Sequence, residues 1–238
     1  MIERFPRAAL AMPTPAETAT SMRSSTEIAE EILRRIQTGR YRPGDPLSQY
    51  ELAAEFGTSR TPIREALRFL EARRAIALTP SGRAIVAVPS AKAVREAFQI
   101  RAELEGLAAA LAVDWLRDEE LQRLSACQEE YARTLRSRVQ GERGSQWLDH
   151  NRSFHQIIAQ ASGNERLQEL ITEMQGGSVA SALSFASRMP PRLMEENIRE
   201  HEAILAALRE RDGPAARQAM VEHVHRTMDL VLDWMASR

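Results

Sequence analysis

Residues 57–70 read Gly-Thr-Ser-Arg-Thr-Pro-Ile-Arg-Glu-Ala-Leu-Arg-Phe-Leu and predict the amphipathic helix on which the N-terminal part of the chain depends. Ser59 is a suitable N-cap, and Pro62 falls in the first turn, where a missing N–H costs least. The apolar side chains recur at helical spacing and form one stripe: Ile63, Ala66, Leu67 and Leu70. The other side of the helix carries Arg60, Thr61, Arg64 and Arg68. One face is therefore expected to be buried, while the other offers guanidinium groups and a hydroxyl to a polyanion.

The residues just before this stretch predict a second, shorter helix. Residues 47–56 have helical character, with Ser48 and Glu51 at the spacing of a capping box. Gly57 suits the left-handed conformation that commonly ends a helix. Two short helices joined by a tight turn that contains glycine, the second with its base-facing residues near its N-terminus, indicate a helix-turn-helix.

A hairpin is predicted after the second helix. The apolar segments 75–78 and 84–88 flank Thr79-Pro80-Ser81-Gly82-Arg83, which has the composition of a turn. The hairpin makes the motif a winged helix-turn-helix. Residues 57–88 contain six arginines and two glutamates, although the whole chain has a net charge of −1. An amphipathic helix with a solvated arginine face is the alternative, but the combination of capped helix, glycine turn, clustered arginines and basic wing favours DNA binding.

Composition excludes several classes of protein. Among 238 residues, 43% are hydrophobic and 27% charged, as in soluble globular proteins, and only 5% are aromatic, which argues against a stacking platform for single-stranded nucleic acid. Cys127 is the only cysteine, so an internal disulfide is excluded and a reducing cytosol is expected. No apolar run approaches the roughly 18–20 residues of a membrane span. The protein is expected to be cytoplasmic, without contact to a membrane.

The spacing of apolar residues and of helix-breaking residues along the chain predicts a mostly α protein with two domains. Residues 1–23 contain three prolines and no periodicity, which predicts a disordered tail. The winged helix-turn-helix domain is expected over 24–88, beginning with a helix capped by Ser25 or Thr26 and followed by a turn-rich connector at 40–46. Ser90 is expected to cap the first helix of an all-α bundle of about six helices over 90–238. Helix breaks are predicted near Gly141 and Gly144, and at 162–164, 176–177, 190–191 and 212–214.

The chain resembles a known family in both parts. The N-terminal residues that carry the resemblance to the GntR family of bacterial transcriptional regulators are Pro43-Gly44, Leu52-Ala53, the block from Ser59 to Leu67, and Gly82. The C-terminal part resembles the FCD effector domain of the FadR subfamily in Ile100-Arg101-x-x-Leu104-Glu105, Phe154-His155, Ser162-Gly163-Asn164, Glu200-His201 and Glu222-His223.

The resemblance implies a DNA-binding regulator, in most cases a repressor, that responds to a small carboxylate metabolite. It implies a homodimer that pairs through the helical domains and presents two winged heads to a palindromic, double-stranded operator. The expected DNA contacts are Ser59, Arg60, Thr61, Arg64, Gly82 and Arg83. Some relatives also use an arginine at the position of Tyr50, which this chain lacks.

The resemblance also implies a site for Zn, Ni or Mn in the helical domain. Its residues match His155, His201 and His223, with Asn151 where relatives carry an aspartate. An amide oxygen can ligate but adds no negative charge. Ordinary polar or core histidines are the alternative, and His150 and His225 are expected to be solvated. Arg101 is expected to bind an effector carboxylate or to form a structural ion pair.

Two other functions fit the sequence less well. A metal-dependent hydrolase would use the histidines, but His201-Glu202 is not followed by the second histidine of His-Glu-x-x-His, and no Ser/His/Asp arrangement is evident. A non-specific architectural DNA binder would need a cationic excess, which a net charge of −1 does not supply. The sequence therefore predicts a regulator and not an enzyme.

Overall fold

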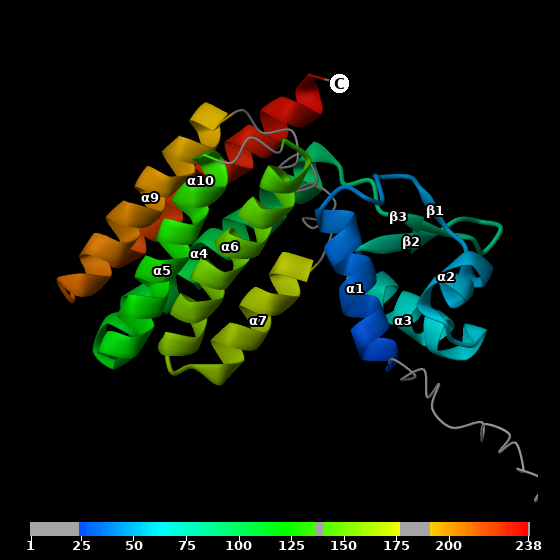
Figure 1. Cartoon of the computed structure of the whole chain (residues 1–238), viewed down its shortest axis with the longest axis horizontal. Helices are drawn as coiled ribbons and strands as arrows, with labels where there is room; N and C mark the ends of the chain where they lie inside the picture. Colours follow the sequence, from blue (N-terminus) through cyan, green and yellow to red (C-terminus); the bar gives the residue numbers. More distant parts are fainter. Residues whose placement is uncertain (1–23, 137–139, 177–190, 238) are drawn as a thin grey trace, which may run out of the picture.

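The computed structural model describes residues 24–136, 140–176 and 191–237. It has two parts, a small winged head that contains α1 to α3 and a larger set of long helices that begins with α4 (Figure 1). The head has one cluster of buried apolar side chains, within residues 28–86. The second part has a large cluster within residues 94–231 and a small one formed by Ala108, Ala159, Leu167 and Ile171. The predicted disordered tail, residues 1–23, lies outside the described residues.

The head combines three helices with a small antiparallel sheet. Its helices are α1 (Ser25–Gln37), α2 (Gln49–Phe56) and α3 (Arg60–Ala72), and its strands are β1 (Pro46–Leu47), β2 (Ile76–Leu78) and β3 (Ala84–Val86). The strand order is β1-β3-β2, and Leu78 pairs with Ala84 beside the turn of the predicted hairpin. The winged helix-turn-helix is confirmed, and α1 packs against α3.

Strand β1 differs from the prediction, because the prolines and glycine of residues 40–46 indicate only a connector. The structure explains how this connector also forms a strand edge. Gly44 N–H donates to Val86 O, and Val86 N–H donates to Asp45 O, so the end of the connector is hydrogen-bonded to the wing. The backbone groups of a proline-rich segment are thus satisfied by β3.

The helix starts differ from the predictions in detail. Helix α1 is capped by Ser24, which forms a complete capping box with Glu27, so the prediction of Ser25 or Thr26 is wrong. Ser48 accepts a hydrogen bond from Glu51 N–H at 3.4 Å, whereas the reciprocal bond of the predicted box is not formed between these two residues. Gly57 has φ 62° and ψ 36°, which confirms the left-handed end of α2.

The second part contains six helices in its described residues. They are α4 (Ala91–Trp115), α5 (Asp118–Arg136), α6 (Gln140–Ala161), α7 (Glu165–Gly176), α9 (Pro191–Arg209) and α10 (Gly213–Ala236). Ser90 caps α4 as predicted, by accepting from Ala93 N–H. The break predicted near Gly141 and Gly144 agrees with the boundary between α5 and α6, since α6 begins at Gln140, although both glycines lie within its first turns. No helix of the described ranges is both long and apolar enough to cross a bilayer.

Helices α4 and α10 form the most extensive contact of this part, and Gly106 permits their close approach. A Cβ placed on Gly106 would lie 2.6 Å from Val221 Cγ2 and 3.4 Å from the backbone oxygen of Arg217. The first separation is too short for a carbon–carbon contact, so a side chain at position 106 would require Val221 or the helices to shift.

Candidate functional site

Helix α3 presents an exposed basic face opposite its buried stripe. Ile63, Ala66, Leu67 and Leu70 are buried as predicted. Ser59, Arg60, Thr61 and Arg64 are all exposed. Neither Arg60 nor Arg64 forms an ion pair with a described carboxylate, and the Ser59 side chain makes no capping hydrogen bond at the N-terminus of α3. These donors are therefore available to a phosphate or a base edge.

The wing ends in a tight turn that exposes its backbone. Thr79 organises this turn, because its Oγ1 accepts from Arg83 N–H at 3.1 Å while its carbonyl accepts from Gly82 N–H at 2.8 Å. Gly82 has φ 75°, and no described atom lies within 4 Å of a Cβ placed there, so the constraint on this residue is conformational rather than steric. Gly82 and Arg83 are both exposed at the tip.

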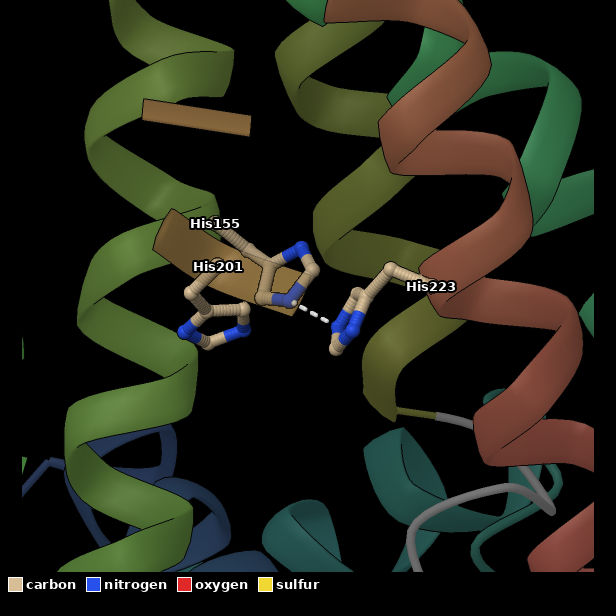
Figure 2. A group of neighbouring side chains, drawn as sticks. All are labelled: His155, His201 and His223. Carbon is tan, nitrogen blue, oxygen red and sulfur yellow. Dashed lines mark hydrogen bonds between the residues drawn. The ribbon is translucent and has the colours of Figure 1, made fainter. Parts of the chain in front are cut away.

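Three buried histidines from three helices converge in the second part. His155 lies on α6, His201 on α9 and His223 on α10, and their rings face one another (Figure 2). One nitrogen from each ring lies within 4.8 Å of the others, and the two closest, Nε2 of His155 and Nε2 of His223, are 3.1 Å apart. Their exposed fractions are 3%, 0% and 2%. The structure thus brings together the three histidines that the sequence singled out.

The other nitrogen of each ring is held by an acceptor. Nδ1 of His155 lies 2.6 Å from Glu105 Oε2, and Nδ1 of His223 lies 2.9 Å from Glu200 Oε2. Nδ1 of His201 lies 2.9 Å from the Gln128 amide oxygen, whose amide nitrogen donates to Ile198 O. Each acceptor favours a proton on Nδ1, which leaves the lone pair of each neutral ring on Nε2.

These contacts leave three lone pairs directed into one small space. Nε2 of His201 is buried and has no hydrogen-bond partner in the described part of the chain. Nε2 of His155 and Nε2 of His223 face each other, and two lone pairs at 3.1 Å repel unless a proton or a cation lies between them. Histidines oriented by carboxylates and amides through Nδ1 are typical of metal sites.

Two carboxylates near the histidines are each offset by an arginine. Arg101 Nη2 lies 2.9 Å from Glu105 Oε1, and Arg226 Nε lies 2.8 Å from Glu200 Oε1. Burial raises the pKa of Glu105, but the charge of Arg101 and the close contact with His155 outweigh it and hold this pKa well below its usual range. The space enclosed by the histidines therefore gains little net negative charge from its surroundings.

Burial also decides the charge of the rings themselves. Burial lowers the pKa of His201 well below its ordinary value, and the neighbouring His223 and His155 add to this effect. Burial likewise lowers the pKa of His223, and its hydrogen bond to Glu200 opposes the shift only in part. Both rings are thus neutral near pH 7, which is the form that binds metals.

Asn151 and Arg101 lie beside this centre with unused hydrogen-bonding capacity. Asn151 Oδ1 and Arg101 Nη1 are both buried without a partner among the described residues, and the two side chains line one small cavity. Arg101 also forms a buried ion pair with Glu105, so it has the structural contact that was one of its two expected roles.

The other predictions for this region have mixed outcomes. His150 and His225 are half-buried rather than solvated, and the His150 ring stacks on Tyr131. Three residues that orient the rings, Glu105, Glu200 and Gln128, had no predicted role. The first two lie within the family motifs, and Glu105 follows Arg101 by four residues on one helix, whereas no local pattern marks Gln128.

The residues present fit a divalent cation. Two of the buried atoms that have no hydrogen-bond partner among the described residues, His201 Nε2 and Asn151 Oδ1, could both be ligands. Three imidazoles and one amide oxygen form a donor set that Zn, Ni or Mn accept. Among the described histidine, cysteine and carboxylate side chains, His155, His201 and His223 form a group that could hold such an ion.

Comparisons with known proteins agree with both parts of the structure. Residues 24–86 match the bacterial regulatory proteins of the gntR family, and residues 96–226 match the FCD domain. The chain is 28% identical over 193 residues to the uncharacterized HTH-type transcriptional regulator YdhC of Bacillus subtilis, covering 81% of this chain and 84% of that protein. It is 26% identical over 190 residues to the HTH-type transcriptional repressor RspR of Escherichia coli, covering 79% and 80%.

A solved structure shares the whole architecture. The structure of E. coli McbR/YncC superposes with a TM-score of 0.80 at 25% identity, and the match covers 89% of this chain and 98% of that one. The match thus extends over both parts of this chain: the winged head, which carries the basic face of α3, and the helical domain, which contains the three buried histidines. The chain belongs to the GntR family of bacterial transcriptional regulators, in the FadR subfamily whose C-terminal part is an FCD domain.

Proposed function

We propose that this DNA-binding regulator is a repressor that responds to a small carboxylate bound in its FCD domain. The proposed regulator would act in the cytoplasm. Support for repression comes from two relatives, RspR of E. coli and a probable D-xylose utilization operon repressor of Paenarthrobacter nicotinovorans, which are repressors by name. The domain division at residues 24–88 and 90–238 is part of the proposal, and the two separate apolar cores support it.

The observation that carries the effector proposal is the convergence of three Nε2 lone pairs in a buried space. His155, His201 and His223 would hold a divalent cation, with Asn151 Oδ1 as a neutral fourth ligand. The cation would supply a positive charge that attracts a carboxylate. Glu105, Gln128 and Glu200 orient the three rings through Nδ1, so the imidazoles keep their direction whether or not a ligand is present.

Arg101 would provide the second contact to the carboxylate. Its guanidinium is already fixed by Glu105 at 2.9 Å, and its Nη1 still has donors without an acceptor among the described residues. A carboxylate oxygen is the strongest acceptor that such a group commonly meets. The ion pair with Glu105 then serves to position the guanidinium rather than to saturate it.

Operator recognition would use α3 and the wing of two chains. Arg60, Thr61 and Arg64, with Ser59 at the start of the helix, would enter the major groove, while Gly82 and Arg83 would contact the backbone or the minor groove. A homodimer would present two such heads to a pseudo-palindrome. Ile100 and Leu107, which lie on one side of α4 and are 51% and 40% exposed, are apolar surface that a second copy could cover.

The metal part of the proposal is tested by metal content and affinity in three variants. The wild-type chain should bind one divalent ion, His201→Gln should lose it, and Asn151→Asp should bind it more tightly because a charge is added directly to the ligand set. Elemental analysis after dialysis and calorimetric titration measure these quantities, and circular dichroism checks the fold of each variant. If neither the wild type nor Asn151→Asp binds a metal, the histidines are direct ligand contacts or core residues.

A further inference from the structure

A small cavity lies where α1 of the winged head meets the FCD domain. Its volume is about 30 Å³, and its polar lining comes from both parts: Arg34 and Gln37 on α1 with Thr38 at its end, Arg101 on α4, Asp149, Asn151 and Arg152 on α6, and Gln175 on α7. In Figure 1, α1 faces α7 at this junction. The cavity therefore connects a residue of the histidine centre, Asn151, to the first helix of the head.

Arg152 is the cation of this cavity that has no carboxylate partner among the described residues. Arg34 is paired with Glu31, and Arg101 is paired with Glu105. Arg152 is half-buried and forms no ion pair with a described carboxylate, although Asp149 and Glu30 attract its charge from a longer distance. Its guanidinium donates to the Gln37 amide oxygen. Arginines withdrawn from water are ordinarily paired with an anion. An amide is a weaker acceptor than a carboxylate.

Arg101 adds a second unused donor to the same cavity. Its side chain is 5% exposed in total, and its Nη1 has no partner in the described ranges. Three guanidinium groups and one carboxylate, that of Asp149, thus line the cavity. Arg152 lacks a described ionic partner, and Arg101 lacks a described acceptor for part of its donors. An oxyanion is the ligand that meets both needs.

We propose that this cavity is an anion site in which a ligand carboxylate bridges Arg101 and Arg152, and that its occupation separates the head from the FCD domain. This inference rests on the proposed carboxylate response and adds the contact through which the response reaches the head. A cavity of about 30 Å³ has room for about two waters. A carboxylate ligand therefore fits only if α1 moves away from α6, which breaks the Gln37–Arg152 contact.

Gln37 is the residue through which this movement acts. It is 7% exposed, it accepts from Arg152, and its amide nitrogen donates to Gln175 O at 3.5 Å. A carboxylate would displace the Gln37 amide from Arg152, because a charged acceptor forms a stronger hydrogen bond with a guanidinium than a neutral amide oxygen does. Because α1 packs against α3, displacement of α1 also displaces the recognition helix.

The test uses the full-length protein and two probes, acetate and succinate, exchanged for chloride at constant ionic strength. Both acids should raise the melting temperature of the wild type, and the dependence on concentration gives the affinity. Arg152→Gln should weaken binding at least tenfold. Gln37→Glu should do the same, because it places an internal carboxylate against Arg152, and it should raise the melting temperature without ligand. Arg166→Gln is the matched control, since Arg166 is an exposed arginine paired with Glu169 on its own helix.

Hydrogen exchange reads the movement separately from binding. Succinate should speed exchange in the last turn of α1 in the wild type and leave it unchanged in Gln37→Glu. If Arg101→Gln abolishes the rise in melting temperature while Arg152→Gln keeps it, Arg152 is not part of the carboxylate site. This result would overturn the inference and leave the proposed function in place. If neither acid stabilises the wild type, both the anion site and the carboxylate response are contradicted. Titration of the operator then tests separately whether the protein binds DNA.

Discussion

At the level of single residues, the histidine centre, formed by His155, His201 and His223, makes the stability of the protein depend on pH. His201 and His223 have pKa values lowered first of all by burial, so the folded chain keeps them neutral below the pH at which the unfolded chain protonates them. The unfolded state then binds more protons than the native state, and stability falls as the pH falls. The effect begins near the ordinary histidine pKa of about 6.5.

We therefore expect the metal-free protein to lose stability between pH 7 and pH 5. The slope should reach up to about 1.4 kcal/mol per pH unit for each histidine that stays neutral. Urea unfolding at a series of pH values, with a chelator present, measures it. His201→Gln should flatten the curve, whereas His225→Gln, a half-buried histidine outside the centre, should leave it as in the wild type.

A second prediction concerns the exposed arginines of α3. Replacement of Arg60 or Arg64 by alanine should cost about 1–3 kcal/mol of operator affinity if each side chain reads a guanine through two hydrogen bonds. Titration of a labelled operator at one salt concentration measures this loss, and Arg166→Ala on α7 is the control for a changed net charge. Unchanged affinity in both variants would show that α3 is not the recognition helix.

How far the sequence predicts these residues depends on how local their signal is. Arg60, Arg64 and the three histidines stand in motifs that carry their chemistry, so they were predictable. Gln128 was not, because a single glutamine between the buried Leu124 and Tyr131 matches no known motif and acquires its role only when α5 packs beside α9. Arg152 was missed for the same reason, since its partner Gln37 is 115 residues away.

At the level of elements, the contact of α4 with α10 depends on the absence of a side chain at Gly106. Replacement by valine would force Val221 and the backbone near Arg217 to move, and overpacking of this kind typically costs about 1–3 kcal/mol. Thermal or urea unfolding should show this loss for Gly106→Val. Gln99→Val, at an exposed position of the same helix, should change stability little. Equal stability of the two variants would contradict the close packing.

The helices and strands also show which elements local sequence rules predict and which depend on tertiary contacts. Helix α3 and the hairpin were predicted because their apolar periodicity and turn residues agree. Strand β1 was missed because two residues carry no periodicity, and it exists only through its pairing with β3. Helix α6 begins at Gln140, beside the predicted break, and includes Gly141 and Gly144 in its first turns, since the cost of a glycine in a helix, about 1 kcal/mol, is small beside the packing of a 22-residue helix.

At the level of the whole molecule, the proposed regulator requires two chains for one operator. The full-length protein should sediment at twice its chain mass of 26.7 kDa, and it should protect two half-sites about one helical turn, or a multiple of it, apart. Leu107→Glu should shift the equilibrium toward monomer, because a charge would have to be buried in the contact proposed for α4. Sedimentation of the wild type as a monomer at micromolar concentration would exclude this assembly.

The uncharged Asn151 has a consequence for what the regulator senses. The carboxylates nearest the histidines are already offset by Arg101 and Arg226, so the proposed ligand set carries no net charge of its own. A divalent cation held there would keep its charge uncompensated until an organic acid arrived, and each would raise the affinity of the other by the same factor. Such a protein works as a coincidence detector: its output follows the product of two concentrations, and neither the nutrient nor the ion alone is enough to change it.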